Sequence, residues 1–233
     1  LLVFDCLKKA ENNKNGRCYR LFWENRFVVL AFIFAATVLG VVFMIAGAFP
    51  FGDATALRMD LYHQYGPLFC ELYDRVTNFR TFNYSWISGG GSSFIGNYFN
   101  YLSSPLSVLI LLFDRKQMPY AITTIIALKG ALCAVSFTYY LKSSLKRHSY
   151  LSACFGVFYA FCGYYLAYYW NIMWLDGMIL LPLIALGIEK IINETKPLLY
   201  IVCLTVLFYS SYYMAYMVCI FSVIYFVCYY ILK

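Results

Sequence analysis

Two aspartates, Asp53 and Asp60, lie seven residues apart directly after the first long apolar run of the chain. On a helix, positions seven apart lie two turns apart on one face, so both carboxylates could point into one site. A carboxylate placed there could act as a general base that takes a proton from an attacking hydroxyl. Arg58 and His63 flank Asp60 and could hold a phosphate. The alternative is a hydrated loop at a membrane surface, where charged residues are common.

Lys129 is a second candidate, because it lies near the middle of the apolar run Met118–Leu141. At the helical rise of 1.5 Å per residue, its position is about 16 Å from one end of that run. An ammonium at such a depth in hydrocarbon costs at least ~2.5 kcal/mol, so Lys129 should face a cavity or a partner. The partner could be a lipid phosphate or a carboxylate. Equally, Lys129 could pack against backbone carbonyls between helices.

Two short polar interruptions between later apolar runs could also contribute to a site. The first, Trp170–Asp176, ends in a carboxylate that the helix dipole favours whatever its function. Trp170 and Trp174 suit a membrane–water interface. The second, Tyr209–Tyr213, carries hydroxyls that could bind a sugar, although an interfacial tyrosine belt would explain them equally well.

A glycine–serine segment and the cysteines do not indicate a catalytic or metal-binding site. The segment Gly89–Ser93 lacks the Gly-Lys-Ser/Thr ending of a phosphate-binding loop and favours a turn. The 9 cysteines show no Cys-x-x-Cys or Cys/His metal spacing, and we interpret most of them as small apolar residues. No metal site is predicted. A divalent cation is an open alternative. One or two carboxylates plus water would give a magnesium ion few protein ligands.

The composition indicates an integral membrane protein. Hydrophobic residues make up 63% of the 233 residues and charged residues 12%, against about 45–50% and 25% in ordinary soluble domains. The apolar runs are long and unbroken rather than alternating, which predicts helical spans and not a barrel. We therefore expect an all-α fold, a polytopic bundle of transmembrane helices.

About six apolar runs are long enough to be considered as spans. They are Phe27–Ala48, Met118–Leu141, Tyr150–Tyr169, Trp174–Ile192, Leu198–Tyr209 and Met214–Leu232. Residues 1–26 form a polar, basic segment, and residues 27–233 are predicted to form one transmembrane domain. Residues 49–117 form a single long loop. Within that loop Tyr101–Phe113 is apolar, but at about 13 residues it suits an interfacial or re-entrant helix better than a crossing.

The distribution of the net charge of +7 predicts the topology. Basic residues gather in segment 1–26, which the positive-inside rule places in the cytoplasm. If Tyr101–Phe113 does not cross, Lys142, Lys146 and Arg147 lie on that same side. The outer face then carries Asp53, Asp60, Trp170–Asp176 and Tyr209–Tyr213. No soluble domain with an exposed basic face is present, so nucleic acid is not an expected partner.

Several short motifs, in this order along the chain, resemble the bacterial YfhO membrane proteins. They are Asp53, Asp60 with Gln64-Tyr65, Leu102-Ser103-Ser104-Pro105, Lys129, Trp174-Leu175-Asp176 with Leu181-Pro182-Leu183, and Tyr212-Tyr213-Met214-Ala215-Tyr216-Met217. The likeness runs from about Leu21 to the last residue. Family members are much longer, so we expect this chain to correspond to an N-terminal portion. One departure is Ser211-Tyr212-Tyr213, where Asx-Phe-Tyr is common.

The resemblance implies a C-type glycosyltransferase fold, with an essential carboxylate in the first outer loop. Such proteins are thought to move a sugar from a polyprenyl-phosphate donor to a cell-envelope acceptor, such as teichoic acid, at the outer face of the bacterial plasma membrane. Carried onto this chain, the catalytic base would be Asp60, with Asp53 second. The substrate-binding candidates are Arg58, His63, Gln64, Tyr65, Lys129, Trp174, Asp176 and Tyr212.

Two alternatives to an enzyme fit parts of the pattern. A transporter or flippase of lipid-linked sugars would also need intramembrane charge such as Lys129. Inverted repeats would favour that function, and the sequence contains no evident repeat. A purely structural subunit would leave Lys129 and the two aspartates without a purpose.

Overall fold

A computed structural model of the chain describes residues 22–233, so most of the predicted basic segment 1–26 lies outside the described residues. Within the described part, five helical segments are long and apolar enough to cross a membrane. They are Arg26–Ile45, Arg115–Ser143, Tyr150–Tyr168, Ile172–Glu194 and Tyr212–Leu232. A sixth, Leu198–Ser210, has 13 residues and is shorter than the ~20 of a usual crossing. The predicted all-α, polytopic membrane bundle is confirmed.

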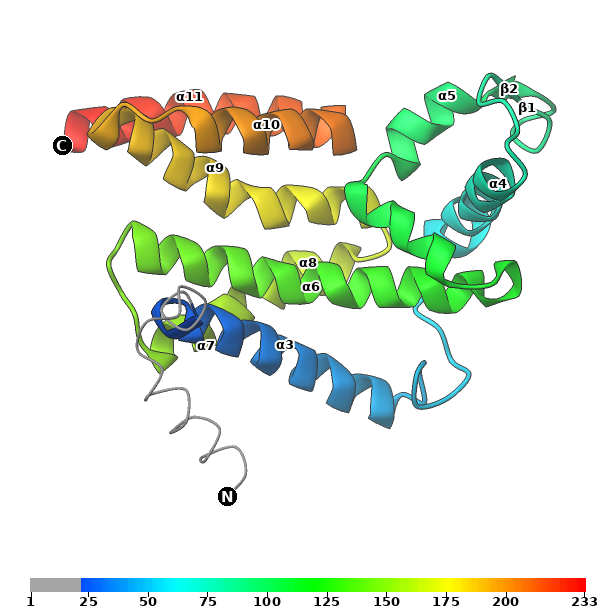
Figure 1. Ribbon diagram of the computed structural model, residues 1–233, viewed down its shortest axis with the longest axis horizontal. Coiled ribbons are helices and arrows are strands. Elements are labelled where there is room, and N and C mark those ends of the chain that lie inside the picture. The colour runs from blue at the N-terminus through cyan, green and yellow to red at the C-terminus, as the bar shows by residue number, and fades with distance from the viewer. Residues whose placement is uncertain (1–21) are drawn as a thin grey trace.

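The long helices run roughly parallel and surround one central helix (Figure 1). Their bounds are α3 (Arg26–Ile45), α6 (Met118–Ser143), α7 (Tyr150–Ala160), α8 (Gly163–Tyr168), α9 (Leu175–Glu194), α10 (Leu198–Ser210) and α11 (Tyr212–Leu232). Helix α6 contacts α3, α7 and α9. Two-thirds of its apolar stretch is buried inside the protein, against 17% for α3 and for α11. The rest of the described chain therefore leaves most of the surface of α3 and α11 uncovered.

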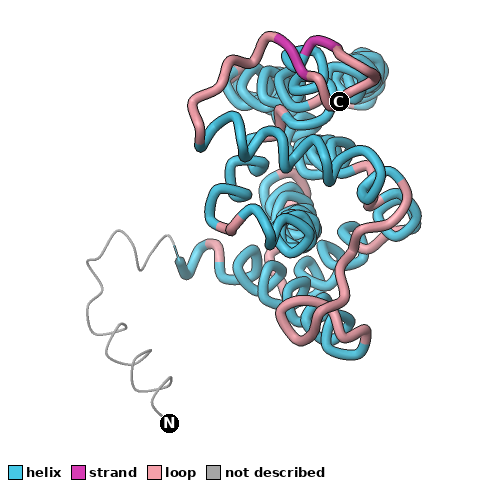
Figure 2. The backbone as a smooth tube through the Cα atoms, turned by 90° about the vertical axis from the view of Figure 1, so that its right-hand side faces the viewer, coloured by secondary structure: helices cyan, strands magenta, loops and turns pink. Residues whose placement is uncertain are grey.

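The long loop between α3 and α6 folds into short elements. In chain order they are the π-helix Leu61–Tyr65, α4 (Gly66–Thr77), β1 (Tyr84–Ser85), β2 (Ser92–Ser93), α5 (Phe94–Asn97), the π-helix Tyr98–Leu102, and the 3-10 helices Pro105–Leu112 and Arg115–Gln117. Strands β1 and β2 pair antiparallel, joined by a turn in which three consecutive glycines, Gly89 to Gly91, adopt positive φ. Figure 2 looks onto this end and shows the strands and loops lying over the helix ends.

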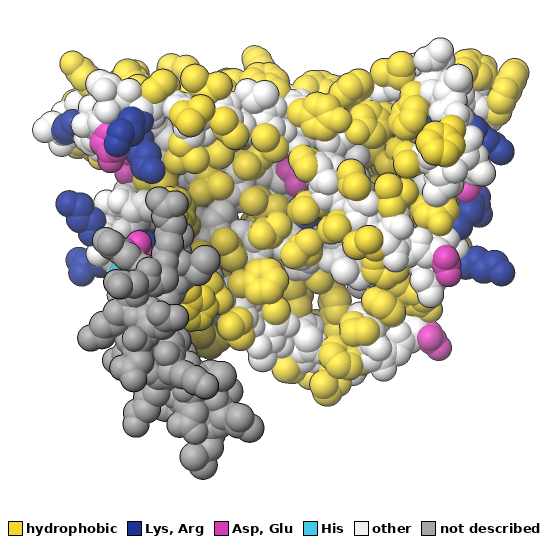
Figure 3. Space-filling model, in the orientation of Figure 1, with side chains coloured by type: hydrophobic (Ala, Val, Ile, Leu, Met, Phe, Trp, Pro, Cys, Tyr) yellow, Lys and Arg dark blue, Asp and Glu magenta, His cyan; other side chains and the backbone are white. Residues whose placement is uncertain are grey.

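The two ends of the bundle differ in what they carry. The loop end holds residues 46–117, the 3-10 turn Ile172–Trp174 and the break between α10 and α11 (right in Figure 1). The basic end holds the start of α3, the end of α6 and the α6–α7 and α9–α10 connections (left in Figure 1). These segments carry Arg26, Lys142, Lys146, Arg147 and Lys196. Charged side chains gather at both ends, with a mainly hydrophobic middle (Figure 3). The predicted grouping of segments by side is therefore confirmed, and the assignment of the basic end to the cytoplasm stays a prediction.

Three predicted boundaries differ from the structure or are refined by it. The first helix ends at Ile45 rather than Ala48, because Gly47 turns with a φ of 61° and Ala48 pairs with Ala54. The predicted span Tyr150–Tyr169 is broken between α7 and α8. Tyr101–Phe113 holds the end of a π-helix and an eight-residue 3-10 helix, and its interfacial or re-entrant position stays a prediction.

The prediction that one helix carries both Asp53 and Asp60 is wrong. Asp53 lies in a bend just before Ala54, and helical structure begins only at Asp60. The two carboxylates therefore belong to different local structures and do not share a helix face.

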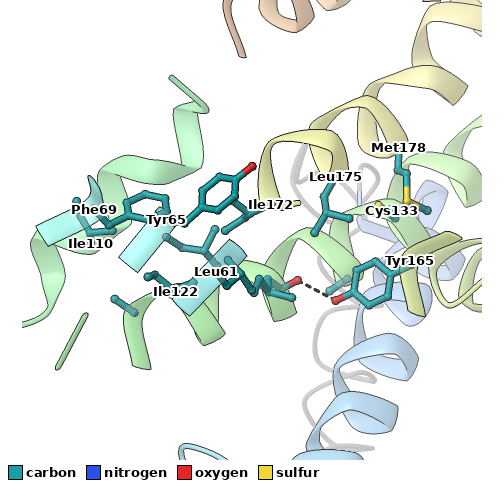
Figure 4. Packing of buried hydrophobic residues seen from close by; sticks show 14 of the residues in the cluster. Leu61, Tyr65, Phe69, Ile110, Ile122, Cys133, Tyr165, Ile172, Leu175 and Met178 are labelled. Atoms are coloured by element: carbon teal, nitrogen blue, oxygen red, sulfur yellow. Dashed lines mark hydrogen bonds between the residues drawn. The ribbon is translucent and has the colours of Figure 1, made fainter. Parts of the chain in front are cut away.

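The hydrophobic core has two parts. The larger cluster joins the loop end to α6, and Figure 4 shows Leu61, Tyr65, Phe69 and Ile122 in it. The smaller cluster lies among α9, α10 and α11 and contains Ile184, Ile188, Cys203, Leu207, Ala215 and Val218. The larger cluster ties the loop directly to the membrane helices, so the loop is part of the packed structure.

Candidate active site

Asp60 is exposed and stands at the start of the π-helix Leu61–Tyr65. Leu61 and Tyr65 are 0% and 1% exposed and anchor this helix in the core. Met59, just before Asp60, has a φ of 50°, which is uncommon for a residue other than glycine. Single π-turns are frequent at functional sites. The buried anchors thus hold an exposed carboxylate at a defined position.

The local sequence explains the wide helical turn. Gly66 donates its backbone N–H to Leu61, five residues earlier. Pro67 has no N–H and cannot bond to the His63 carbonyl as an α-helix would require. The regular α-helix α4 therefore starts at Gly66 and Pro67, and the preceding residues adopt the wider π-turn.

The charged neighbours of Asp60 are open to solvent. Asp53, Arg58 and His63 are all exposed. In the part of the chain that the structure describes, no ion pair involves Asp53, Arg58 or Asp60. His63 has its ring edge-on to Tyr62, with 5.1 Å between ring centroids. These charges are therefore available to a substrate, as the prediction for a site requires.

Tyr65 lies behind Asp60 rather than on the open surface, and Gln64 is half-buried beside it. The Tyr65 ring packs edge-on against Tyr101, with 5.5 Å between centroids. Among the described residues its hydroxyl has no hydrogen-bond partner. Burial, with contributions from Tyr101 and Asp60, raises the pKa of the Tyr65 hydroxyl. Tyr65 is thus a buried phenol five residues after Asp60, on the π-helix that Asp60 precedes.

The second π-helix, Tyr98–Leu102, joins the loop to the break between α10 and α11. The Tyr98 and Tyr209 hydroxyls are 2.9 Å apart. Ser103 donates its hydroxyl to the Ser210 carbonyl at 3.3 Å. Burial and the hydrogen bond to Tyr209 raise the pKa of Tyr98 to about 12. Sequence reasoning missed Tyr98 and Tyr101, because aromatic residues are too abundant in this chain to mark a contact.

Lys129 and Asp176, two predicted site residues 47 positions apart, form an ion pair inside the bundle. The Lys129 Nζ lies 2.9 Å from Asp176 Oδ2 and 2.9 Å from the Ile172 carbonyl oxygen. The two side chains are 1% and 6% exposed. Lys129 therefore has the partner that was expected for it, and the structure identifies that partner as a carboxylate together with a backbone carbonyl. The two charges neutralise each other inside the protein, so this geometry does not support either residue as a substrate contact.

Trp174 and Tyr212, the remaining candidates, lie near an apolar cavity among α8, α9 and α11. The cavity measures about 450 Å³, and its walls include Tyr164, Trp174, Met178, Tyr213 and Met217. Trp174 is half-buried, whereas Tyr212 is exposed as the first residue of α11. The chemistry of the walls suits an apolar chain rather than a sugar.

No metal centre is evident within residues 22–233, where no three His, Cys, Asp or Glu side chains gather closely enough to hold an ion. The cysteines of this part are free thiols. A divalent cation stays an open alternative. The residues at the loop end can accept a proton, at Asp60, and can attract an anion, at Arg58 and His63.

Comparisons with known proteins agree on one group of proteins. A family model described as bacterial membrane protein YfhO matches residues 31–233. The uncharacterized protein YfhO of Bacillus subtilis (strain 168) is 31% identical over 168 residues, which is 66% of this chain and 19% of that relative. The matched region thus spans about a fifth of the curated relative. No solved structure matches the chain at a significant level.

Proposed function

The chain belongs to the YfhO family of bacterial membrane proteins, and from that premise we propose that it transfers a sugar from a polyprenyl-phosphate donor to a cell-envelope acceptor. The acceptor is a hydroxyl-bearing polymer such as teichoic acid, and the reaction takes place at the outer face of the plasma membrane. One observation carries the proposal: Asp60 is an exposed carboxylate on a core-anchored π-helix at the loop end, opposite the basic end.

The reaction would invert the sugar at its anomeric carbon. The acceptor oxygen forms a bond to that carbon while the bond to the phosphate oxygen breaks and polyprenyl phosphate leaves. The acceptor proton passes to the Asp60 carboxylate, which acts as the general base. Negative charge builds on the leaving phosphate, and the exposed side chains of Arg58 and His63 would stabilise it.

The apolar surroundings support a lipid-linked donor. Helices α3 and α11 expose most of their surface, and the cavity beside Trp174 is lined largely by aromatic and methionine side chains. A polyprenyl chain can lie against such surfaces while its phosphate stays at the water boundary. In this proposal the sugar binds at Asp60.

The decisive experiment compares Asp60→Asn and Asp53→Asn with the unchanged protein in lipid nanodiscs. The assay follows labelled polyprenyl-phosphate sugar and an envelope acceptor. A positioned general base contributes about 10²–10⁴-fold, so Asp60→Asn should lower kcat by about 100-fold or more. Asp53→Asn should have a smaller effect, because Asp53 lies in a separate bend.

Glu194→Gln is the matched control, since Glu194 is an exposed carboxylate at the basic end and its removal should leave transfer unchanged. Full transfer by both aspartate variants would refute the assignment of the base. Sugar lipid that crosses the bilayer without any transfer would favour a flippase instead.

A further inference from the structure

The buried ion pair holds a turn of the backbone as well as two helices. Lys129 on α6 and Asp176 in the first turn of α9 are joined by a direct bond between their side chains. The same ammonium also binds the Ile172 carbonyl oxygen at 2.9 Å. Ile172 opens the 3-10 turn Ile172–Trp174, which has only three residues. One charged group thus fixes where this short turn lies relative to α6.

The turn Ile172–Trp174 also belongs to the packing under the loop. Ile172 is 2% exposed and lies in the same hydrophobic cluster as Leu61 and Tyr65. Figure 4 shows Tyr65 and Ile172 among the packed residues of this cluster. The π-helix Tyr98–Leu102 contacts the turn, and its Tyr101 packs edge-on against Tyr65. Contacts therefore lead from the ion pair, through the turn, to both π-helices.

We propose that Lys129 and Asp176 are positioning residues that set the two π-helices, and with them Asp60, through the turn Ile172–Trp174. They are not substrate contacts. The catalytic consequence rests on the proposed function, whereas the positioning itself does not. An ammonium can bond a carboxylate and a carbonyl at once, which an apolar pair of similar volume cannot do. The ion pair is therefore suited to specifying one arrangement of the turn.

The test uses the double variant Lys129→Met/Asp176→Leu, which removes both charges and leaves neither buried without a partner. The matched control is Tyr140→Phe/Glu189→Leu/Tyr225→Phe. It deletes a second buried polar cluster between α6, α9 and α11, in which Glu189 accepts hydrogen bonds from Tyr140 at 3.0 Å and Tyr225 at 2.6 Å. These residues lie toward the basic end.

Hydrogen–deuterium exchange in nanodiscs is the first readout. We expect residues 61–66 and 98–104 of the double variant to exchange at least about tenfold faster, because their local opening becomes easier. Exchange in α3 and α11 should be unchanged, and the control variant should keep both loop segments at the wild-type rate. Unchanged loop exchange in the folded double variant would overturn the proposal, as would an equal increase in the control.

Kinetics are the second readout. A misplaced base lowers kcat by about 10–100-fold with little change in KM for the donor, whereas a lost substrate contact raises KM. A raised KM with unchanged kcat would therefore contradict positioning. If the unchanged protein transfers no sugar, the proposed function fails and the exchange result still decides the positioning role.

Should the double variant not fold, Asp176→Asn replaces it. This change keeps the shape and one oxygen acceptor for Lys129 but removes the negative charge. The same two loop segments should then exchange faster by a smaller factor, and equal exchange would again refute the proposal.

Discussion

At the scale of single residues, burial distinguishes charged side chains that are paired inside the protein from those that are exposed to a substrate. Arg75 is 8% exposed and bonds Glu71 Oε1 through Nε at 3.0 Å and Nη2 at 2.6 Å. It also donates to the carbonyls of Thr81 and Tyr84, and Ser85 donates to Glu71 at 2.8 Å. This cluster binds the β-hairpin to α4. The charges around Asp60 have no such partners within the described residues.

Arg75→Met should detach the β-hairpin from α4. The change leaves the Glu71 carboxylate buried without its counter-charge, which costs roughly 3–5 kcal/mol. We expect a lower melting temperature and new protease cleavage between residues 79 and 93. The control is Arg115→Met, whose pair with Asp74 is exposed and contributes about 1 kcal/mol or less. Equal stability of the two variants would show that the Arg75 cluster does not hold the hairpin.

His148, in the connection between α6 and α7, predicts a pH dependence of stability. Burial, then the charges of Lys142 and Arg26, holds the pKa of its imidazole below the usual 6.5. The folded protein therefore binds this proton less readily than the unfolded chain. Stability should be full above pH 6.5 and fall as the pH drops through that value. Melting curves between about pH 7.5 and 5.5 should show this fall, and His148→Gln should reduce it.

The role of a single residue could be predicted where its own position in the sequence determines that role. It could not be predicted where the role depends on a second residue far away in the sequence. The cost of burying an ammonium predicted that Lys129 needs a partner, and this is confirmed. The identity of the partner was not predictable, because no spacing rule relates residues on different helices 47 positions apart. The neighbours Arg58 and His63 made Asp60 a candidate base, and that role stays a prediction. The separation of Asp60 from the face of Asp53 was not predictable, since seven-residue spacing has meaning only if a helix forms.

At the scale of elements, close helix contacts depend on small residues. Gly156 of α7 faces α6, where a Cβ would overlap Thr138 Oγ1 and the Ala134 carbonyl. Helices α6 and α7 can therefore approach each other only while this position lacks a side chain.

Gly156→Ala should separate α6 from α7 and destabilise the protein by about 1–3 kcal/mol, as overpacking usually does. Thermal unfolding in detergent, followed by size-exclusion chromatography, measures the loss. Gly40→Ala is the matched control, since a Cβ at that position would meet no atom within 4 Å and alanine favours helix. A melting temperature for Gly156→Ala as high as that of Gly40→Ala would contradict the tight contact.

Long helices could be predicted from the chain because apolar runs of membrane length leave few other structures open. The interruption between α7 and α8 and the two π-helices were not predictable. Their hydrogen bonds depend on local details, such as the missing N–H of Pro67, and on tertiary anchors such as Leu61. Hydropathy does not report either effect.

At the scale of the whole molecule, the grouping of segments at two ends allows a topology test. Alkaline phosphatase fused after Asp60 and after Asp176 should be active, because the enzyme folds only outside the cytoplasm. A fusion after Ser144, at the basic end, should be inactive. An active Ser144 fusion, or an inactive Asp176 fusion, would place the loop end in the wrong compartment for the proposed reaction.

The bonds between the loop and the α10–α11 break have a consequence for biogenesis. Ser103 binds a carbonyl that lies 107 positions later in the chain, and Tyr98 binds a hydroxyl 111 positions later. When the ribosome has just released the loop, these hydrogen-bond partners have not yet been synthesised. We therefore expect nascent chains arrested before Ser210 to present a loop that proteases cut readily. Extension through α11 should protect it, so that the part of the molecule made early matures last.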